Sequence, residues 1–252
     1  MDASFLKPQG TSTTWSREPR RRRRSGGGGG YYPRAHAITD PALIDSADKA
    51  NGFLKRAFDL GAALAGLVVL SPILITAGLL IWLQDRGPIL YGHKRVGRKG
   101  RHFQCWKFRS MVRHGDEVLK AYLETYPPAA AEWERTQKLV KDPRVTRIGA
   151  FLRKTSIDEL PQLWNVLIGQ MSVIGPRPIT RPELDRYGAD RRYYLLVRPG
   201  ITGLWQVSGR NNTTYERRIA LDRHYLENWS YRQDVDILLR TPLAVLRSEG
   251  AS

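Results

Sequence analysis

The hydrophobic pattern is dominated by one apolar run, residues 60–83, which contains no formally charged side chain. At about 1.5 Å per residue a helix of this length is about 36 Å long, and the hydrocarbon core of a bilayer is about 30 Å thick. Length therefore permits a membrane span. Ser71 and Pro72 interrupt the run near its middle, and Pro72 has no N–H to donate to the helix. The pattern predicts two short helical limbs joined by a kink.

Basic residues flank this run on both sides, and near membranes such residues prefer the cytosol. They are Lys49, Lys55 and Arg56 before the run, and Arg86, Lys94 and Arg95 after it. A straight span would move one cluster across the membrane, whereas a re-entrant helix hairpin leaves both in the cytosol. We favour the hairpin, for residues 51–86. The alternatives are a straight span and a buried core helix, which rarely has so long an apolar run.

The chain before this run is polar and basic. Residues 20–24 are all arginine and residues 26–30 are all glycine, a composition that cannot build a core. We expect residues 1–50 to be a disordered tail, either fully solvated or in contact with anionic lipid.

After the run the pattern indicates short elements. Turn-forming glycines separate β-prone pieces at residues 89–91 and 102–106, which carry Lys107 and Arg109. A pair of helices follows within residues 115–140, broken at Pro127 and Pro128. A stripe at helical spacing then predicts a helix that starts near Ser156; its members are Leu160, Leu163, Trp164 and Leu167.

A later helical stripe admits two interpretations. Tyr215, Ile219, Leu226 and Trp229 share one face, which suits either the membrane interface or packing against the core. The predicted fold is α+β and mostly helical. It combines the re-entrant hairpin, a small β element and interfacial amphipathic helices around a cytosolic catalytic helix, with residues 87–252 as a cytosolic domain at the membrane interface.

Charge and cysteine content narrow the function. The 252 residues carry a net charge of +17, which attracts anions such as phosphates, acidic lipids or nucleic acids. Nine lysines and arginines and no acid lie within residues 86–113. Cys105 is the only cysteine, so an intrachain disulfide and a zinc site made of cysteines are excluded.

The candidate chemistry lies at Asp158 and Glu159, which we expect in the first turn of the helix from Ser156. Ser156 and Glu159 have the spacing of a capping box, which accounts for one acid. Capping does not require two adjacent carboxylates beside Arg153 and Lys154. A helix N-terminus flanked by cations binds phosphate, and an ionised aspartate held there is available as a nucleophile.

Five ordered motifs within residues 52–247 resemble those of the bacterial sugar transferases, which are monotopic polyprenyl-phosphate phosphoglycosyl transferases. The motifs are Phe58-Asp59 opening the Ser-Pro-broken run, KFRSM at 107–111, RKTSIDELPQ at 153–162, GPRP at 175–178 and RPGITGLWQVSGR at 198–210. Larger relatives carry further membrane helices and another domain in front, so this chain resembles the minimal catalytic form.

The resemblance implies transfer of a sugar-1-phosphate, galactose or glucose, from a UDP-sugar to polyprenyl (undecaprenyl) phosphate in exopolysaccharide, O-antigen or capsule assembly. It implies that Asp158 forms the covalent phosphosugar and that Glu159 holds Mg²⁺. The residues expected to bind substrate phosphates are Lys107, Arg109, Arg153, Arg177 and Arg210. It also implies membrane lipids as partners and the cytosolic face of the bacterial inner membrane as the location.

Two other functions fit part of the sequence. A nucleic-acid-binding protein explains the charge but has no use for the apolar run, and no nucleic-acid-binding module is visible. We therefore expect no nucleic-acid partner. A membrane-anchored scaffold or regulator explains the run and the charge but gives the paired carboxylates no task. The sequence leaves open whether the chain forms a homo-oligomer.

Overall fold

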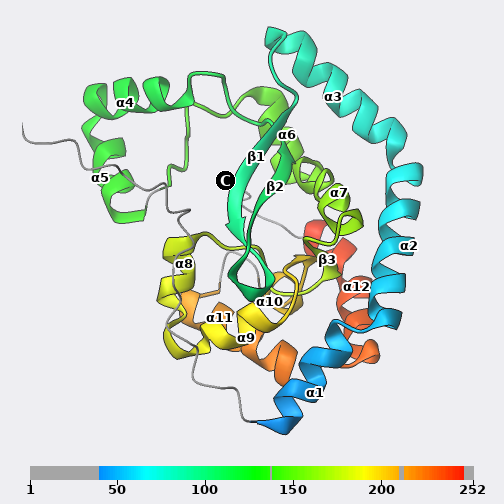
Figure 1. The fold of residues 1–252 in the computed structure, drawn as a ribbon. Coiled ribbons are helices and arrows are strands. Elements are labelled where there is room, and N and C mark those ends of the chain that lie inside the picture. Colours follow the sequence, from blue (N-terminus) through cyan, green and yellow to red (C-terminus); the bar gives the residue numbers. More distant parts are fainter. Residues whose placement is uncertain (1–39, 137, 210–212, 247–252) are drawn as a thin grey trace, which may run out of the picture. The chain divides into compact units, whose positions relative to one another are not determined.

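The structure is a computed structural model that describes residues 40–136, 138–209 and 213–246, and Figure 1 shows its elements. The helices are α1 Pro41–Ala50, α2 Phe53–Val69, α3 Ser71–Asp85, α4 Gly115–Thr125, α5 Pro127–Thr136, α6 Arg147–Lys154, α7 Gln162–Leu167, α8 Arg181–Arg186, α9 Arg191–Leu196, α10 Leu204–Val207, α11 Tyr215–Glu227 and α12 Tyr231–Leu246. The strands are β1 Leu90–Val96, β2 His102–Phe108, β3 Ser172–Ile174 and β4 Gly200–Thr202. Three 3₁₀ turns are η1 Arg98–Gly100, η2 Ile157–Glu159 and η3 Gly188–Asp190. The expectation of a mostly helical fold with a small β element is confirmed.

The apolar run forms two helices, α2 and α3, which meet at a break at Leu70. Pro72 cannot donate a hydrogen bond to the carbonyl of Val68, four residues earlier. The Ser71 hydroxyl donates to that carbonyl instead, at 2.8 Å, so the carbonyl of Val68 keeps a hydrogen-bond donor at the break. Among the described residues no single helix is long and apolar enough to cross a membrane. Residues 41–69 and 71–85 meet that test together, as a pair bent by 61°.

Helix α1 lies inside the range that we expected to be a disordered tail. Asp40 caps it by accepting a hydrogen bond from the backbone N–H of Ala42 at 3.0 Å, and Leu43 and Ala47 are buried. Residues 41–50 contain few large apolar side chains, and the arginine and glycine runs dominate the composition of the chain before them. The boundary of the tail at residue 50 is therefore corrected, and residues 1–39 lie outside the described part.

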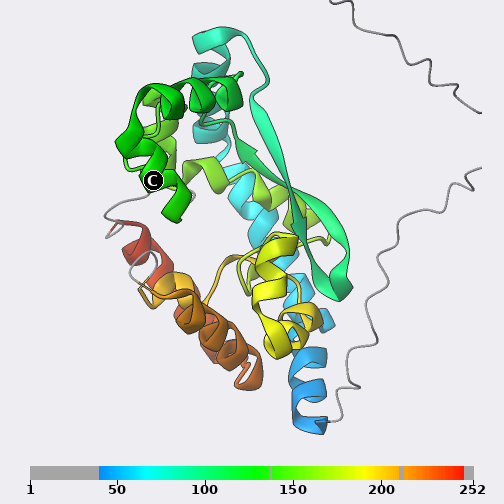
Figure 2. The same ribbon diagram turned by 90° about the vertical axis from the view of Figure 1, so that its left-hand side faces the viewer.

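The strands form two separate pairs. β1 and β2 make an antiparallel hairpin from Leu90 opposite Phe108 to Val96 opposite His102, and Figure 2 shows it as a long twisted ribbon. β3 and β4 are parallel. The predicted strands on either side of the glycine-rich turn are thus confirmed, whereas the parallel pair was not foreseen.

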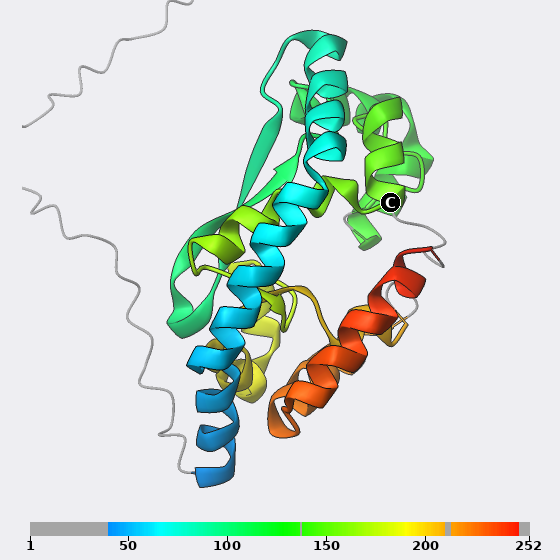
Figure 3. The same ribbon diagram turned by 90° about the vertical axis from the view of Figure 1, so that its right-hand side faces the viewer.

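The apolar run belongs to the core of the molecule. Figure 3 shows α2 crossing α7, against which it packs. Ala63 of α2 and Val166 of α7 are fully buried in a core that also receives side chains from β2, β3, α9, α11 and α12. The opposite faces of α2 and α3 are apolar and exposed, with Leu64, Val69 and Ile75 between 59% and 73% exposed.

The stripe on α11 packs against the core. Ile219 and Leu226 are buried, and so is Trp229 just beyond the helix. Of the two interpretations left open, the structure supports packing. On α12 Ile237 is buried while Val235 and Leu239 are exposed.

Candidate functional site

The paired carboxylates lie on a short 3₁₀ turn, η2. The prediction that a helix starts near Ser156 is wrong. Ser156 adopts a left-handed conformation with φ 57° and its side chain caps no helix. Pro161 lacks the N–H that would bond to the carbonyl of Ile157. The 3₁₀ turn therefore does not continue as an α-helix, and α7 begins at Gln162. Trp164 of the predicted apolar stripe is 54% exposed.

Two segments that are distant in sequence converge on these carboxylates. Lys107 of β2 places its Nζ 2.6 Å from Glu159 Oε1 and 4.0 Å from Asp158 Oδ2. Arg177, from the loop after β3, places Nη2 3.7 Å from Glu159 Oε1. The structure thus brings together four of the candidate residues in an arrangement of two carboxylates and two cations.

Asp158 is the most buried member of this group, with 7% of its surface exposed. Burial raises the pKa of its carboxyl to about 6, and the Lys107 ammonium opposes that shift. The carboxylate is therefore ionised above about pH 6, in surroundings with little water to stabilise its charge. Water therefore screens the negative charge of Asp158 less than it would screen a carboxylate on the surface.

Arg177 is positioned by the parallel strands. The Gly175 N–H donates to the Thr202 carbonyl at 2.9 Å, and the Gly200 N–H donates to the Pro176 carbonyl at 2.7 Å. A Cβ on Gly200 would lie 2.1 Å from the backbone nitrogen of Gly175, so no larger residue fits there. The GPRP and RPGITG motifs are therefore two halves of one loop platform, which sequence reasoning did not reveal.

A buried ion cluster anchors β3, just before this loop. Lys55 Nζ lies 3.0 Å from Asp59 Oδ1 and 3.1 Å from Asp234 Oδ2, and all three residues are at most 4% exposed. The backbone N–H of Val173 donates to Asp59 Oδ1 at 3.0 Å, and the Tyr225 hydroxyl donates to Asp234 at 2.9 Å. The cluster links α2 and α12 to β3, the strand that precedes the Arg177 loop.

The other candidate arginines have different surroundings. Burial lowers the pKa of Arg153, and the negative charge of Asp158 opposes that shift; its Nε donates to Ser110 Oγ at 2.8 Å. Arg109 forms a two-pronged ion pair with Asp85 at the end of α3. Arg109 is therefore paired with Asp85, and the structure does not bring it to Asp158 and Glu159. Arg210 lies outside the described residues.

The donor set suits a hard cation that is bound mainly by substrate and water. No group of three or more metal-ligating side chains occurs among the described residues. Mg²⁺ is commonly held by one or two carboxylates together with water and phosphate oxygens, and Asp158 and Glu159 supply two. Glu159 Oε1 is paired with Lys107 in this structure, so a bound cation would compete with that ammonium.

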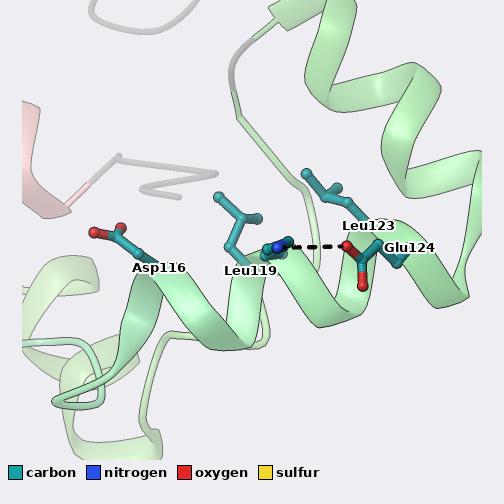
Figure 4. A pocket seen from close by; sticks show the side chains of 5 residues that line it. Asp116, Leu119, Leu123 and Glu124 are labelled. Atoms are coloured by element: carbon teal, nitrogen blue, oxygen red, sulfur yellow. Dashed lines mark ion pairs between the residues drawn. The ribbon is translucent and has the colours of Figure 1, made fainter. Parts of the chain in front are cut away.

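The surface of the described residues is hollowed at the site and also on α4. The hollow at the site is lined by Arg95, Cys105, Lys107, Glu159, Gln162, Arg177, Pro178 and Ile201. The second is on α4, where Lys120 and Glu124 form an ion pair beside Leu119 and Leu123 (Figure 4). The first contains the converging cations, whereas the second offers one paired lysine on an open surface. The first is the candidate active site.

Comparison with known proteins gives consistent matches. The model of the family described as "Bacterial sugar transferase" matches residues 50–248. "UDP-galactose-lipid carrier transferase" of Erwinia amylovora is 53% identical over 81% of this chain and 43% of that protein. "Undecaprenyl-phosphate galactose phosphotransferase" of Salmonella typhimurium is 51% identical over 81% of this chain and 43% of that protein. "Exopolysaccharide production protein ExoY" of Sinorhizobium fredii is 47% identical over 79% of this chain and 88% of that protein.

The matched region therefore covers less than half of the first two relatives and most of the third. It includes the carboxylate turn, the Lys107 strand and the Arg177 platform. On this evidence the chain belongs to the bacterial sugar transferase family.

Proposed function

We propose that this chain transfers a sugar-1-phosphate from a UDP-sugar to undecaprenyl phosphate. The observation that carries the proposal is the buried Asp158 beside two cations, Lys107 and Arg177, which converge from separate segments. The names of two relatives refer to galactose, which favours galactose or its epimer glucose as the sugar. The name of a third relative favours exopolysaccharide synthesis as the role.

The reaction proceeds in two displacements at one phosphorus. Asp158 attacks the β-phosphorus of the donor, a carboxylate oxygen–phosphorus bond forms, and the bond to the bridging oxygen breaks so that UMP leaves. The phosphate of the lipid then attacks the same phosphorus and releases Asp158 as a carboxylate. Phosphoryl transfer depends chiefly on positioning and on neutralising charge, which Lys107 and Arg177 supply.

Glu159 is the residue that we propose for holding Mg²⁺. A bound divalent cation would neutralise the diphosphate of the donor. Lys107, released from Glu159, would then be free to bind a phosphate oxygen.

We further propose that α2 and α3 form a re-entrant hairpin in the cytosolic leaflet of the bacterial inner membrane. Their exposed apolar faces, the 61° bend and the basic residues at both ends support this placement. The lipid phosphate lies at the headgroup plane, so a hairpin held there keeps the site at the depth of its acceptor.

The decisive experiment uses a donor labelled in the β-phosphate, with the acceptor omitted. Wild-type protein should release UMP and retain the label through denaturing electrophoresis, because the phosphosugar is bound covalently. Asp158→Asn should do neither, whereas Asp116→Asn on the exposed face of α4 should behave as wild type. Equal labelling of Asp158→Asn and wild-type protein would refute the covalent mechanism.

A further inference from the structure

A second arginine accompanies Arg177 on the ring of Trp205. Trp205 of α10 is 5% exposed, and the guanidinium of Arg177 lies 5.9 Å from its ring centroid. Arg218, from α11, lies 4.6 Å from the same ring. The indole is thus shared by two cations from different parts of the chain, and a cation over an aromatic face is held in place.

Nearby carboxylates balance the charge on this pair only in part. Among the described residues, the charge of Glu183 acts on both guanidiniums, but Glu183 forms its ion pair with Arg95. Arg218 makes no ion pair with a carboxylate among the described residues, and its buried Nε has no hydrogen-bond partner there. Among the described residues, the carboxylate that pairs with Arg177 is that of Glu159, at 3.7 Å. Burial lowers the pKa of Arg218 and the nearby charge of Arg177 lowers it further. Two like charges held together in this way favour an anion between or beside them.

We infer that Arg177 and Arg218, aligned on Trp205, form a phosphate-binding site and that Arg218 is a substrate-binding residue of this enzyme. A guanidinium presents donors in a planar fork that matches phosphate oxygens, so the class of ligand is a phosphate ester or diphosphate. The inference rests on the proposed function, which supplies two such ligands, the nucleotide donor and the lipid phosphate. Arg218 lies outside every motif identified in the sequence.

The first test measures equilibrium binding of inorganic pyrophosphate to the full chain in detergent. Arg218→Ala should weaken binding roughly ten- to a hundredfold, as expected when a hydrogen bond to a charged group is lost. Arg218→Lys should restore part of it. The matched control is Arg217→Ala, which removes an equal charge from the exposed neighbouring position and should leave binding within about twofold. Thermal unfolding of each variant verifies its fold, and Arg218→Gln serves if the alanine variant unfolds.

The second test assigns the phosphate to its source by steady-state UMP release. A rise in KM for the UDP-sugar alone places the donor at Arg218, and a rise in KM for polyprenyl phosphate alone places the acceptor there. Unchanged pyrophosphate affinity in folded Arg218→Ala, or an equal loss in Arg217→Ala, would overturn the inference. If wild-type protein released no UMP from any UDP-sugar while Arg218 still governed pyrophosphate binding, the proposed function would fail and the site would stand.

Discussion

At the residue scale, Asp158 and Glu159 are neighbours in the chain with different electrostatic surroundings. Glu159 is neutralised directly by Lys107 at 2.6 Å, whereas Asp158 is more deeply buried and 4.0 Å from the same ammonium. One carboxylate is thus a paired anion and the other a poorly solvated one. This difference suits separate roles, Glu159 as a ligand for a cation and Asp158 as a nucleophile.

The raised pKa of Asp158 predicts how activity depends on pH. A nucleophilic carboxylate must be ionised, and the pKa of Asp158 is about 6. Activity should therefore fall about tenfold for each pH unit below about 5.5, in a pH profile of kcat/KM for UMP release, which reports the pKa values of the free enzyme. A profile that stays flat down to pH 4.5 would show that Asp158 is not the group that limits the reaction.

The same shift predicts that Asp158→Asn stabilises the fold at neutral pH. The pKa of the folded state is above the ordinary value of 3.8, so ionisation of Asp158 costs folding free energy as pH rises from about 4 to about 6. The amide removes that cost, which gives a gain of about 3 kcal/mol at pH 8 that disappears near pH 4. Thermal unfolding at both pH values, with Asp116→Asn as the control, measures it. A variant less stable than wild type at pH 8 would contradict the electrostatic explanation.

What the sequence could reveal about single residues depended on how local their partners are. Lys107, Asp158, Glu159 and Arg177 stand in recognisable motifs. Arg109 stands in a motif too, but its partner Asp85 lies 24 residues earlier, and no local pattern reveals that pair. No local pattern separates Arg218 from the other arginines on its helix, and only its tertiary contact with Trp205 distinguishes it.

At the element scale, the features predicted correctly have local causes. The break at Ser71 and Pro72, the helix pair split at Pro127, and the two strands around a glycine-rich turn all follow from nearby residues. The parallel pair β3 and β4 could not be found in this way. Each strand has three residues, and they are held by backbone contacts between motifs more than 20 residues apart.

The bend between α2 and α3 predicts the topology of the chain in the membrane. Changing Ser71 to Ala and Pro72 to Leu should favour a straight helix. A straight helix carries the N-terminal side outward at the expense of the packing between α2 and α7. Cysteines placed singly at exposed Asp45 and Glu117, in a Cys105→Ser background, report the location of each side to a membrane-impermeant thiol reagent. In intact cells neither site should react in the chain with the bend, and Asp45→Cys should react once it is straightened. Labelling of Asp45→Cys with the bend intact would establish a simple span.

Helix α1 revises what a truncation should do. Deletion of residues 1–38 should leave detergent-solubilised activity near wild type, since that segment has little apolar content. Deletion of residues 1–45 should lower the unfolding temperature, because it removes the Asp40 cap and the buried Leu43. Thermal unfolding of both truncated chains tests the difference, and equal stability would show that α1 contributes nothing to the core.

At the scale of the whole molecule, the buried ion cluster predicts coupling between distant helices. Lys55→Met leaves Asp59 and Asp234 buried without their shared cation, and loss of one partner in such a cluster costs about 3–5 kcal/mol. Lys49→Met, which breaks an exposed pair with Asp45, should cost at most about 1 kcal/mol. Thermal unfolding of the two variants compares them directly. Equal effects would show that the buried cluster is energetically neutral.

The two faces of α2 and α3 determine how this enzyme can be handled in water. Their inner faces carry Ala63, Ala77 and Ile81, each at most 4% exposed. Helix α2 also supplies Lys55 and Asp59 to the ion cluster that anchors β3. Deleting residues 53–85 would therefore remove part of the catalytic core together with the exposed apolar side chains of α2 and α3. A detergent-free form has to keep these helices and replace only outward-facing side chains, such as Leu64 and Ile75, with polar ones. The proposed membrane anchor and the catalytic core are thus one folding unit.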